Sequence, residues 1–283
     1  RFGGNDHLRR SPATELMMVC RKVTSILTVL CLAVQTPMIA HAGNTRTPDL
    51  ETVTIPNPYI SAKPADGIFN VIVMGDSIAA GLHQGLTQLN KDRNHIATTR
   101  MAKVNTGLVR RDRFDWNKAA RKIGRDKRHQ IVVVVIGPND LQSIRETGKA
   151  HHFQQDGWVT RYRQRLDQLI KDLKSAGKAV YWVGIPITAP DKYSSEYQYL
   201  NSFFRQAAME NNIRFVDAWA SLANDEGKYD PYWTLENGKK VQIRRRDGIH
   251  FTPKGYEVFA SLLNEVLLKD IFEARMANSA FNN

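Results

Sequence analysis

A run of six β-branched residues constrains the fold of this chain more than any other segment. It extends from Ile131 to Ile136 and contains no polar side chain. Such a strand has to be buried on both faces, as happens at the centre of a parallel sheet that is covered by helices on both sides. The sequence therefore predicts an α/β domain built around this strand.

The segments around this run alternate between strand and helix patterns. Strands are expected at 69–74, 102–104 (as the end of a strand), 131–136, 179–183 and 213–216, and helices at 78–90, 114–122, 161–175, 197–210 and 253–269. This alternation predicts a three-layer α/β/α sandwich around a five-stranded parallel sheet. We expect the domain to occupy residues 67–272, with a hairpin inserted near 225–243 at the Asn237-Gly238 turn, and a frayed tail over 273–283.

The first 42 residues have the layout of a secretory signal peptide. Its parts follow in order: an initiator at Met17 or Met18, positive charge at Arg21 and Lys22, an apolar run over 26–34, and a small-x-small cleavage site at Ala40–Ala42. The apolar run is shorter than the roughly 20 residues that cross a bilayer. We therefore expect cleavage after Ala42, export to a bacterial periplasm, and a linker or surface strap over 43–66.

Composition narrows the classes of site that the exported chain could hold. The two cysteines, Cys20 and Cys31, both lie in the segment that would be removed, so neither disulfides nor cysteine-based metal sites are expected. We expect no metal and no cofactor, because the chain has no phosphate-binding loop and no His-Glu-x-x-His motif.

The charge of the chain bears on its partners. The net charge of +12 favours anionic partners, but no nucleic-acid-binding motif is present. Acidic glycans or the anionic envelope surface are therefore the expected partners, and solvated surface charge is the alternative.

Three short motifs stand where predicted strands end and helices begin. They are Gly75-Asp76-Ser77, Gly137-Pro138-Asn139-Asp140 and Asp247-Gly248-Ile249-His250. In an open parallel sheet, sites form just beyond the carboxyl ends of the strands. Ser77 offers a nucleophilic hydroxyl at the start of a helix, where free N–H groups and the helix dipole suit a developing oxyanion.

The other motif residues supply the remaining parts of a serine esterase. The spacing of Asp247 and His250 lets the carboxylate hold one ring nitrogen while the other takes the serine proton. Gly107, after the second strand, can present a backbone N–H without a side chain in the way, and the amide of Asn139 is a further donor. Asp140 is expected to pin its loop, and Asp76 is a second supporting carboxylate.

Each motif taken alone also has an ordinary structural explanation. Gly-Asp-Ser is common as a helix N-cap, Gly107 suits a turn, Gly-Pro-Asn-Asp suits the end of a strand, and the Asp/His pair follows a basic run, Arg244-Arg245-Arg246, that is typical of an exposed loop. Their occurrence in order, each at the end of a successive sheet unit, favours a common site.

These motifs resemble those of the SGNH hydrolase superfamily, the GDSL-like esterases, over about residues 68–270, with Ile78 where the longer motif has leucine. Asn105-Thr106-Gly107-Leu108, together with Asp112, Phe114, Asp115 and Trp116, resembles a periplasmic branch long catalogued as a domain of unknown function. The resemblance implies a flavodoxin-like SGNH fold. It also implies Ser77 as nucleophile, His250 as base, Asp247 as its orienting group, and Ser77, Gly107 and Asn139 as the oxyanion hole.

The sequence and this resemblance together predict an exported serine esterase. Its expected substrate is a small acyl ester, O-acetyl above all, on an envelope glycan such as peptidoglycan or a polysaccharide. The alternatives are an O-acyltransferase, a lipase or a thioesterase with the same triad, and a catalytically silent glycan-binding or assembly protein on the same scaffold. The presence of Ser77, Asp247 and His250 argues against a silent protein, since binding alone does not need all three.

Overall fold

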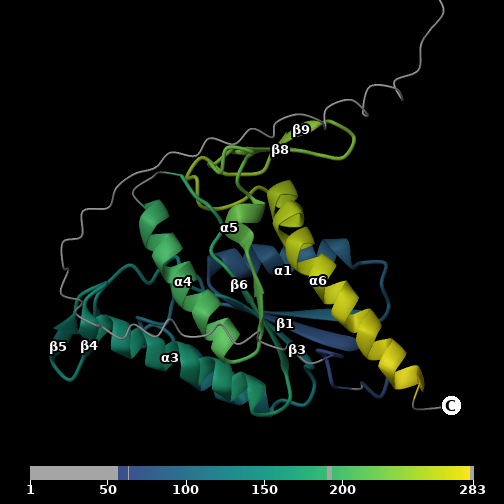
Figure 1. Ribbon diagram of the computed structural model, residues 1–283, viewed down its shortest axis with the longest axis horizontal. Helices are drawn as coiled ribbons and strands as arrows, with labels where there is room; N and C mark the ends of the chain where they lie inside the picture. Colours follow the sequence, from purple (N-terminus) through teal and green to yellow (C-terminus); the bar gives the residue numbers. More distant parts are fainter. Residues whose placement is uncertain (1–56, 63, 190–192, 281–283) are drawn as a thin grey trace, which may run out of the picture. The chain divides into compact units, whose positions relative to one another are not determined.

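The computed structural model describes residues 57–62, 64–189 and 193–280 (Figure 1). The predicted signal segment, its cleavage site and the strap up to residue 56 lie outside these residues. Among the described helices, none combines the length and hydrophobicity that a membrane-crossing segment needs.

Five parallel strands form the central sheet. They are β1 (Phe69–Gly75), β2 (Ile96–Ala102), β3 (Ile131–Val135), β6 (Ala179–Val183) and β7 (Arg214–Val216), in the order β2-β1-β3-β6-β7. All neighbouring pairs are parallel. Strand β3 lies at the centre, and each of its five residues is buried. The predicted five-stranded parallel sheet is therefore confirmed, with the β-branched run as its middle strand.

Helices cover both faces of the sheet (Figure 1). They are α1 (Ser77–Leu89), α2 (Trp116–Arg125), α3 (Asp156–Lys174), α4 (Ser194–Glu210), the short α5 (Ala218–Ser221) and α6 (Pro253–Ala280). Alternate residues of β1 enter two separate cores: Val71 and Val73 pack with α1 and α6, whereas Ile72 and Met74 pack with α2, α3 and α4. Because side chains alternate across a strand, one short apolar strand supports both layers, and the three-layer prediction is confirmed.

The last helix is longer than its sequence pattern predicts. The expected end at Lys269 and the expected frayed tail from 273 are wrong for the described residues, since α6 continues to Ala280. Leu267, Ile271 and Ala274 extend its buried stripe in the core that it shares with α1. Continued burial of this stripe keeps the helix regular beyond Lys269.

Two antiparallel hairpins lie outside the central sheet. Strands β8 (Tyr232–Thr234) and β9 (Lys240–Gln242) pair within the segment where an inserted hairpin is predicted. Strands β4 (Ile144–Glu146) and β5 (Lys149–His151) form a second hairpin that the sequence pattern did not indicate. The second hairpin follows the Gly-Pro-Asn-Asp motif directly, so it lies next to the candidate site.

Candidate active site

The turn between β1 and α1 places Ser77 at the first position of a helix. Asp76 caps this helix, because its carboxylate accepts a hydrogen bond of 2.9 Å from the N–H of Ile78. Gly75 has a φ of 145°, and a Cβ there would lie 1.8 Å from the carbonyl oxygen of Val135. Only glycine permits this close approach of β1 to β3. The first two residues of Gly-Asp-Ser therefore shape the turn and cap the helix that position Ser77.

Ser77, His250 and Asp247 form one continuous hydrogen-bonded chain. The Oγ of Ser77 lies 2.9 Å from Nε2 of His250, and Nδ1 of His250 lies 2.9 Å from Oδ2 of Asp247. The other carboxylate oxygen of Asp247 accepts the backbone N–H groups of Ile249 and His250, each at 2.9 Å. The tight Asp-x-x-His turn thus fixes its own carboxylate, and the fold brings together three side chains from opposite ends of the domain.

The charge state of Asp247 suits the task of orienting His250. Burial acts to raise the pKa of this carboxyl, but the hydrogen bonds from the backbone of His250 and Ile249 and from the His250 ring outweigh it and lower the pKa below its usual value. Asp247 is therefore ionised at neutral pH. An ionised carboxylate holds the proton of His250 on Nδ1, which leaves Nε2 as the acceptor that faces Ser77.

Arg244 stabilises the turn that carries Asp247 and His250, a role that the sequence did not indicate. The basic run at 244–246 is typical of an exposed loop, but the Arg244 side chain is 0% exposed. Its guanidinium donates to the carbonyls of Ile249 and Ile187 and lies 3.6 Å from the centre of the Phe251 ring. Burial lowers the pKa of Arg244 to about 10. Only tertiary contacts distinguish this arginine from the two that follow it.

Two of the predicted oxyanion donors have no acceptor within the described part of the chain. These are the N–H groups of Ser77, at the start of α1, and of Gly107, in the loop after β2. Unpaired N–H groups are uncommon in buried positions, and Gly107 is buried. Both residues were predicted to line an oxyanion hole, and the structure leaves both donors available for that role.

Asn139, the third predicted oxyanion donor, is partly committed elsewhere. Its side-chain amide donates to the carbonyl oxygen of Thr106 at 3.0 Å and to Oδ2 of Asp76 at 3.4 Å. The second bond is long and therefore weak. Asn139 can serve an oxyanion by exchanging that second bond for the ligand, which makes it a less direct donor than the two backbone groups.

Asp140 anchors the loop that carries Gly107. Its buried carboxylate accepts hydrogen bonds from the N–H of Leu108 at 3.0 Å, the N–H of Val109 at 2.9 Å and the hydroxyl of Tyr162 at 3.0 Å. Burial raises the pKa of Asp140 to about 6. Burial also raises the pKa of Asp76 to about 7, and the nearby charge of Asp140 adds to that rise. Two buried carboxyl groups thus hold the backbone of the site: Asp76 caps the helix that begins at Ser77, and Asp140 holds the loop after Gly107.

A pocket of 330 Å³ opens at Ser77 and His250. Its other lining residues are Asn105, Pro138, Asn139, Leu141, Gln142, Tyr193, Tyr197 and Ile249. None of these other residues is an Asp, Glu, Lys, Arg or His. Leu141 and Gln142 were not identified from the sequence. They carry no chemical signature, and their position directly after Gly-Pro-Asn-Asp was the one available signal.

The reactive groups that line this pocket are the hydroxyl of Ser77 and the imidazole of His250. Its other lining residues with polar side chains are Asn105, Asn139, Gln142, Tyr193 and Tyr197. The described residues hold no group of three or more His, Cys, Asp or Glu side chains placed as a metal site requires.

Comparison with known proteins places the chain in a family. The family described as "Protein of unknown function (DUF459)" matches residues 70–266. The chain belongs to this family. The predicted membership of a family without an assigned function is confirmed by this match, and Ser77, His250 and Asp247 are arranged as the resemblance implies. No curated protein matches significantly.

Solved structures also align with this member of the family. A GDSL-like lipase from Bacteroides thetaiotaomicron is 18% identical, with 74% of this chain and 92% of that chain covered and a TM-score of 0.49. A putative acylhydrolase from Bacteroides fragilis is 19% identical, with 76% and 93% covered and a TM-score of 0.49. An acetyl xylan esterase from Geobacillus stearothermophilus is 18% identical, with 72% and 96% covered and a TM-score of 0.46.

Proposed function

We propose that this protein is a serine esterase that uses Ser77 as its nucleophile. The observation that carries the proposal is the pair of 2.9 Å contacts that link Ser77 Oγ to His250 and His250 to Asp247. In the reaction, Oγ attacks the ester carbonyl while Nε2 of His250 takes the serine proton. Asp247 holds the ring in place and stabilises the imidazolium that forms.

Negative charge then develops on the carbonyl oxygen of the tetrahedral intermediate. The N–H groups of Ser77 and Gly107 are the proposed donors to this oxygen, and Asn139 joins them when it releases Asp76. When the intermediate collapses, the C–O bond to the alcohol breaks and His250 returns its proton to the leaving alcohol. A water molecule, deprotonated by His250, then attacks the acyl-serine, and the products are a carboxylic acid and the free enzyme.

The dimensions of the pocket favour a small acyl group. Its volume of 330 Å³ is near the lower end of the roughly 300–1,000 Å³ that ligand pockets span. An O-acetyl group on a sugar hydroxyl fits this size, and the expected export of the chain would bring it to envelope glycans such as peptidoglycan or a polysaccharide. Transfer of the acyl group to a second hydroxyl would use the same residues, with the acceptor alcohol in place of water.

Hydrolysis of p-nitrophenyl acetate, butyrate and octanoate by the purified protein tests the proposal. We expect the rate to fall as the acyl chain lengthens and to be abolished in Ser77→Ala. The matched control is Ser202→Ala, an exposed serine on α4, which should retain wild-type rates. Turnover by Ser77→Ala would contradict the assignment of the nucleophile, and a rate that rises toward octanoate would favour a lipase instead.

A further inference from the structure

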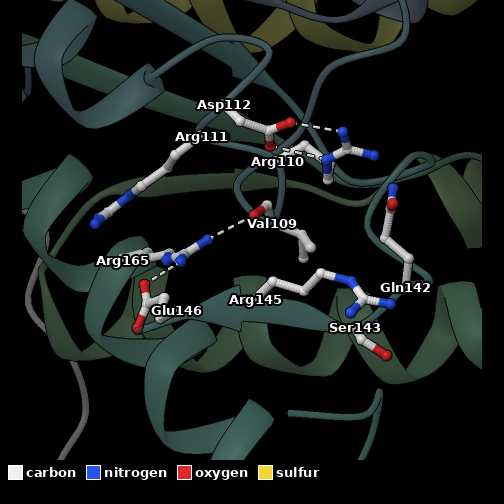
Figure 2. Close-up of a pocket in the computed structure, with 9 residues that line it drawn as sticks. All are labelled: Val109, Arg110, Arg111, Asp112, Gln142, Ser143, Arg145, Glu146 and Arg165. Atoms are coloured by element: carbon white, nitrogen blue, oxygen red, sulfur yellow. Dashed lines mark hydrogen bonds and ion pairs between the residues drawn. The ribbon is translucent and has the colours of Figure 1, made fainter. Parts of the chain in front are cut away.

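A second and larger pocket adjoins the candidate active site. Its volume is 780 Å³, and its lining residues are Val109, Arg110, Arg111, Asp112, Gln142, Ser143, Arg145, Glu146 and Arg165 (Figure 2). Gln142 lines both this pocket and the pocket at Ser77. A ligand of the size of a sugar or larger can therefore extend from one pocket into the other.

The arginines of this pocket outnumber its carboxylates by four to two. Arg110 is held by Asp112 through two hydrogen bonds of 2.8 Å and 2.6 Å. Arg165 forms an ion pair with Glu146. Both carboxylates are thus already paired with arginines of the same pocket, and the remaining two arginines carry the excess positive charge.

Arg111 and Arg145 have no carboxylate bonded to them among the described residues. Arg111 donates a hydrogen bond of 2.8 Å to the amide oxygen of Asn117. Its pKa is lowered, first by burial and then by the positive charge of Arg165. The side chain of the exposed Arg145 forms neither a hydrogen bond nor an ion pair with any residue that the structure describes. In Figure 2 its guanidinium extends toward Gln142, on the side that the two pockets share.

Arg165, which also lines this pocket, is hydrogen-bonded to the segment that follows Gly107. Arg165 is only 4% exposed and donates to the carbonyls of Leu108 and Val109 at 2.6 Å and 2.8 Å. The N–H groups of these same two residues are held by Asp140. Leu108 and Val109 are therefore held on both their N–H and their C=O sides, and Val109 belongs to the lining of the larger pocket.

We propose that the arginine pocket binds an anionic group, a carboxylate or a sulfate, on the alcohol part of the ester whose acyl group lies at Ser77. The inference rests on the proposed esterase function and adds a substrate class to it: acylated acidic sugars. Arginine presents planar N–H donors that match the oxygens of these anions. The pocket at Ser77 is lined by neither arginine nor lysine, so an acidic substrate would find its charge complement in the neighbouring pocket.

The test compares acetylated sugars that differ in one substituent: a carboxylate, its uncharged carboxamide, or a sulfate ester. These are an O-acetylated methyl glucuronoside, its uncharged carboxamide, and an O-acetylated methyl glucoside 6-sulfate. For the wild type we expect kcat/KM to be about tenfold higher for an anionic substrate than for the carboxamide, which corresponds to one charge-assisted hydrogen bond at the low end of its range. The preference should shrink as salt is added, because Arg145 is exposed.

Variants of Arg145 locate the source of this preference. Arg145→Gln should bring the ratio of anionic to uncharged kcat/KM close to one, and Arg145→Lys should retain part of it. The matched control is Arg125→Gln, an exposed arginine at the end of α2, which removes the same charge and should keep both the ratio and the rate on p-nitrophenyl acetate. Preference for the carboxylate or for the sulfate supports the inference and identifies the anion.

Three results would overturn the inference, and they are distinguishable. Equal kcat/KM for the anionic and uncharged sugars, with Ser77-dependent hydrolysis of p-nitrophenyl acetate intact, would refute the arginine pocket and leave the esterase standing. The absence of Ser77-dependent hydrolysis of any ester would refute the esterase, and the substrate class would fall with it. A preference that persists in Arg145→Gln but disappears in Arg125→Gln would also contradict the assignment.

Discussion

Substitution of Gly107 by alanine should damage both stability and catalysis. A Cβ at this position would lie 2.1 Å from Oδ1 of Asp140, and ordinary contact begins at 3.4 Å, so the carboxylate would have to move by about 1.3 Å. Such a shift breaks hydrogen bonds that Asp140 accepts at 2.9 Å from Val109 and 3.0 Å from Leu108. Hydrogen bonds to charged groups contribute about 1.5–3 kcal/mol each, so losing two should lower the free energy of unfolding by about 3 kcal/mol or more.

The same substitution also displaces a proposed oxyanion donor. Loss of one such donor typically lowers kcat by about 10²–10³-fold, and we expect a fall of that size for Gly107→Ala on p-nitrophenyl acetate. Urea unfolding and initial rates, measured on the same preparation below its unfolding midpoint, separate the two effects. Gly157→Ala in α3 is the control, because the nearest atoms to its added methyl group belong to the partly exposed ring of His151, with Nδ1 at 2.6 Å, and a side chain can move where a buried carboxylate cannot. Wild-type stability and rate in Gly107→Ala would refute the reasoning.

Three further predictions concern the residues around the triad. Asp247→Asn should lower kcat by about 10³-fold or more with little loss of stability, because an amide cannot hold the His250 ring in the required tautomer; rates close to wild type would show that another group orients the ring. Arg244→Met should lower the free energy of unfolding in urea by about 2 kcal/mol or more, since it leaves the carbonyl of Ile249 without its donor, and an unchanged midpoint would contradict this. Burial raises the pKa of Asp76 to about 7, above the unfolded value near 3.9. The native state therefore binds this proton more tightly than the unfolded state. As the pH rises from 5 to 8, the free energy of unfolding of the wild type should fall relative to that of Asp76→Asn. A relative stability that rises with pH would contradict this prediction.

Most of the sheet could be predicted because its signals are local. The second strand, expected to end over 102–104, is in fact Ile96–Ala102, an edge strand whose residues are mostly exposed or half-buried and so give a weak pattern. The β-branched run at 131–136 and the alternation of strand and helix patterns each depend on neighbouring residues. The end of α6 depends on contacts that a sequence pattern does not contain. Lys269 and Asp270 interrupt the apolar stripe, but Asp270 is fully buried, where it accepts hydrogen bonds from Tyr181 and Arg214. Asp270 therefore does not end the helix, as its charge suggests in the sequence, but is buried and bonded to the distant Arg214.

The triad could be predicted for the same kind of reason. Ser77 begins α1 just after β1, and His250 stands three residues before α6, each in a short motif whose residue types match a known chemistry. The supporting contacts could not be predicted. The burial of Arg244 and the excess charge around Arg145 arise from the packing of segments far apart in the chain, and their residue types are common on exposed loops. Sequence therefore identifies the reacting groups more readily than the residues that hold the substrate.

Covalent labelling tests the central claim, an activated nucleophile at Ser77, most directly. The protein is incubated with a fluorophosphonate, and intact mass followed by peptide mapping locates the adduct. We expect one adduct per chain on the peptide that contains Ser77, none in Ser77→Ala, and slower labelling in Asp247→Asn. Absence of an adduct in the wild type, or an adduct on a different serine, would contradict this claim and favour a binding role for this scaffold.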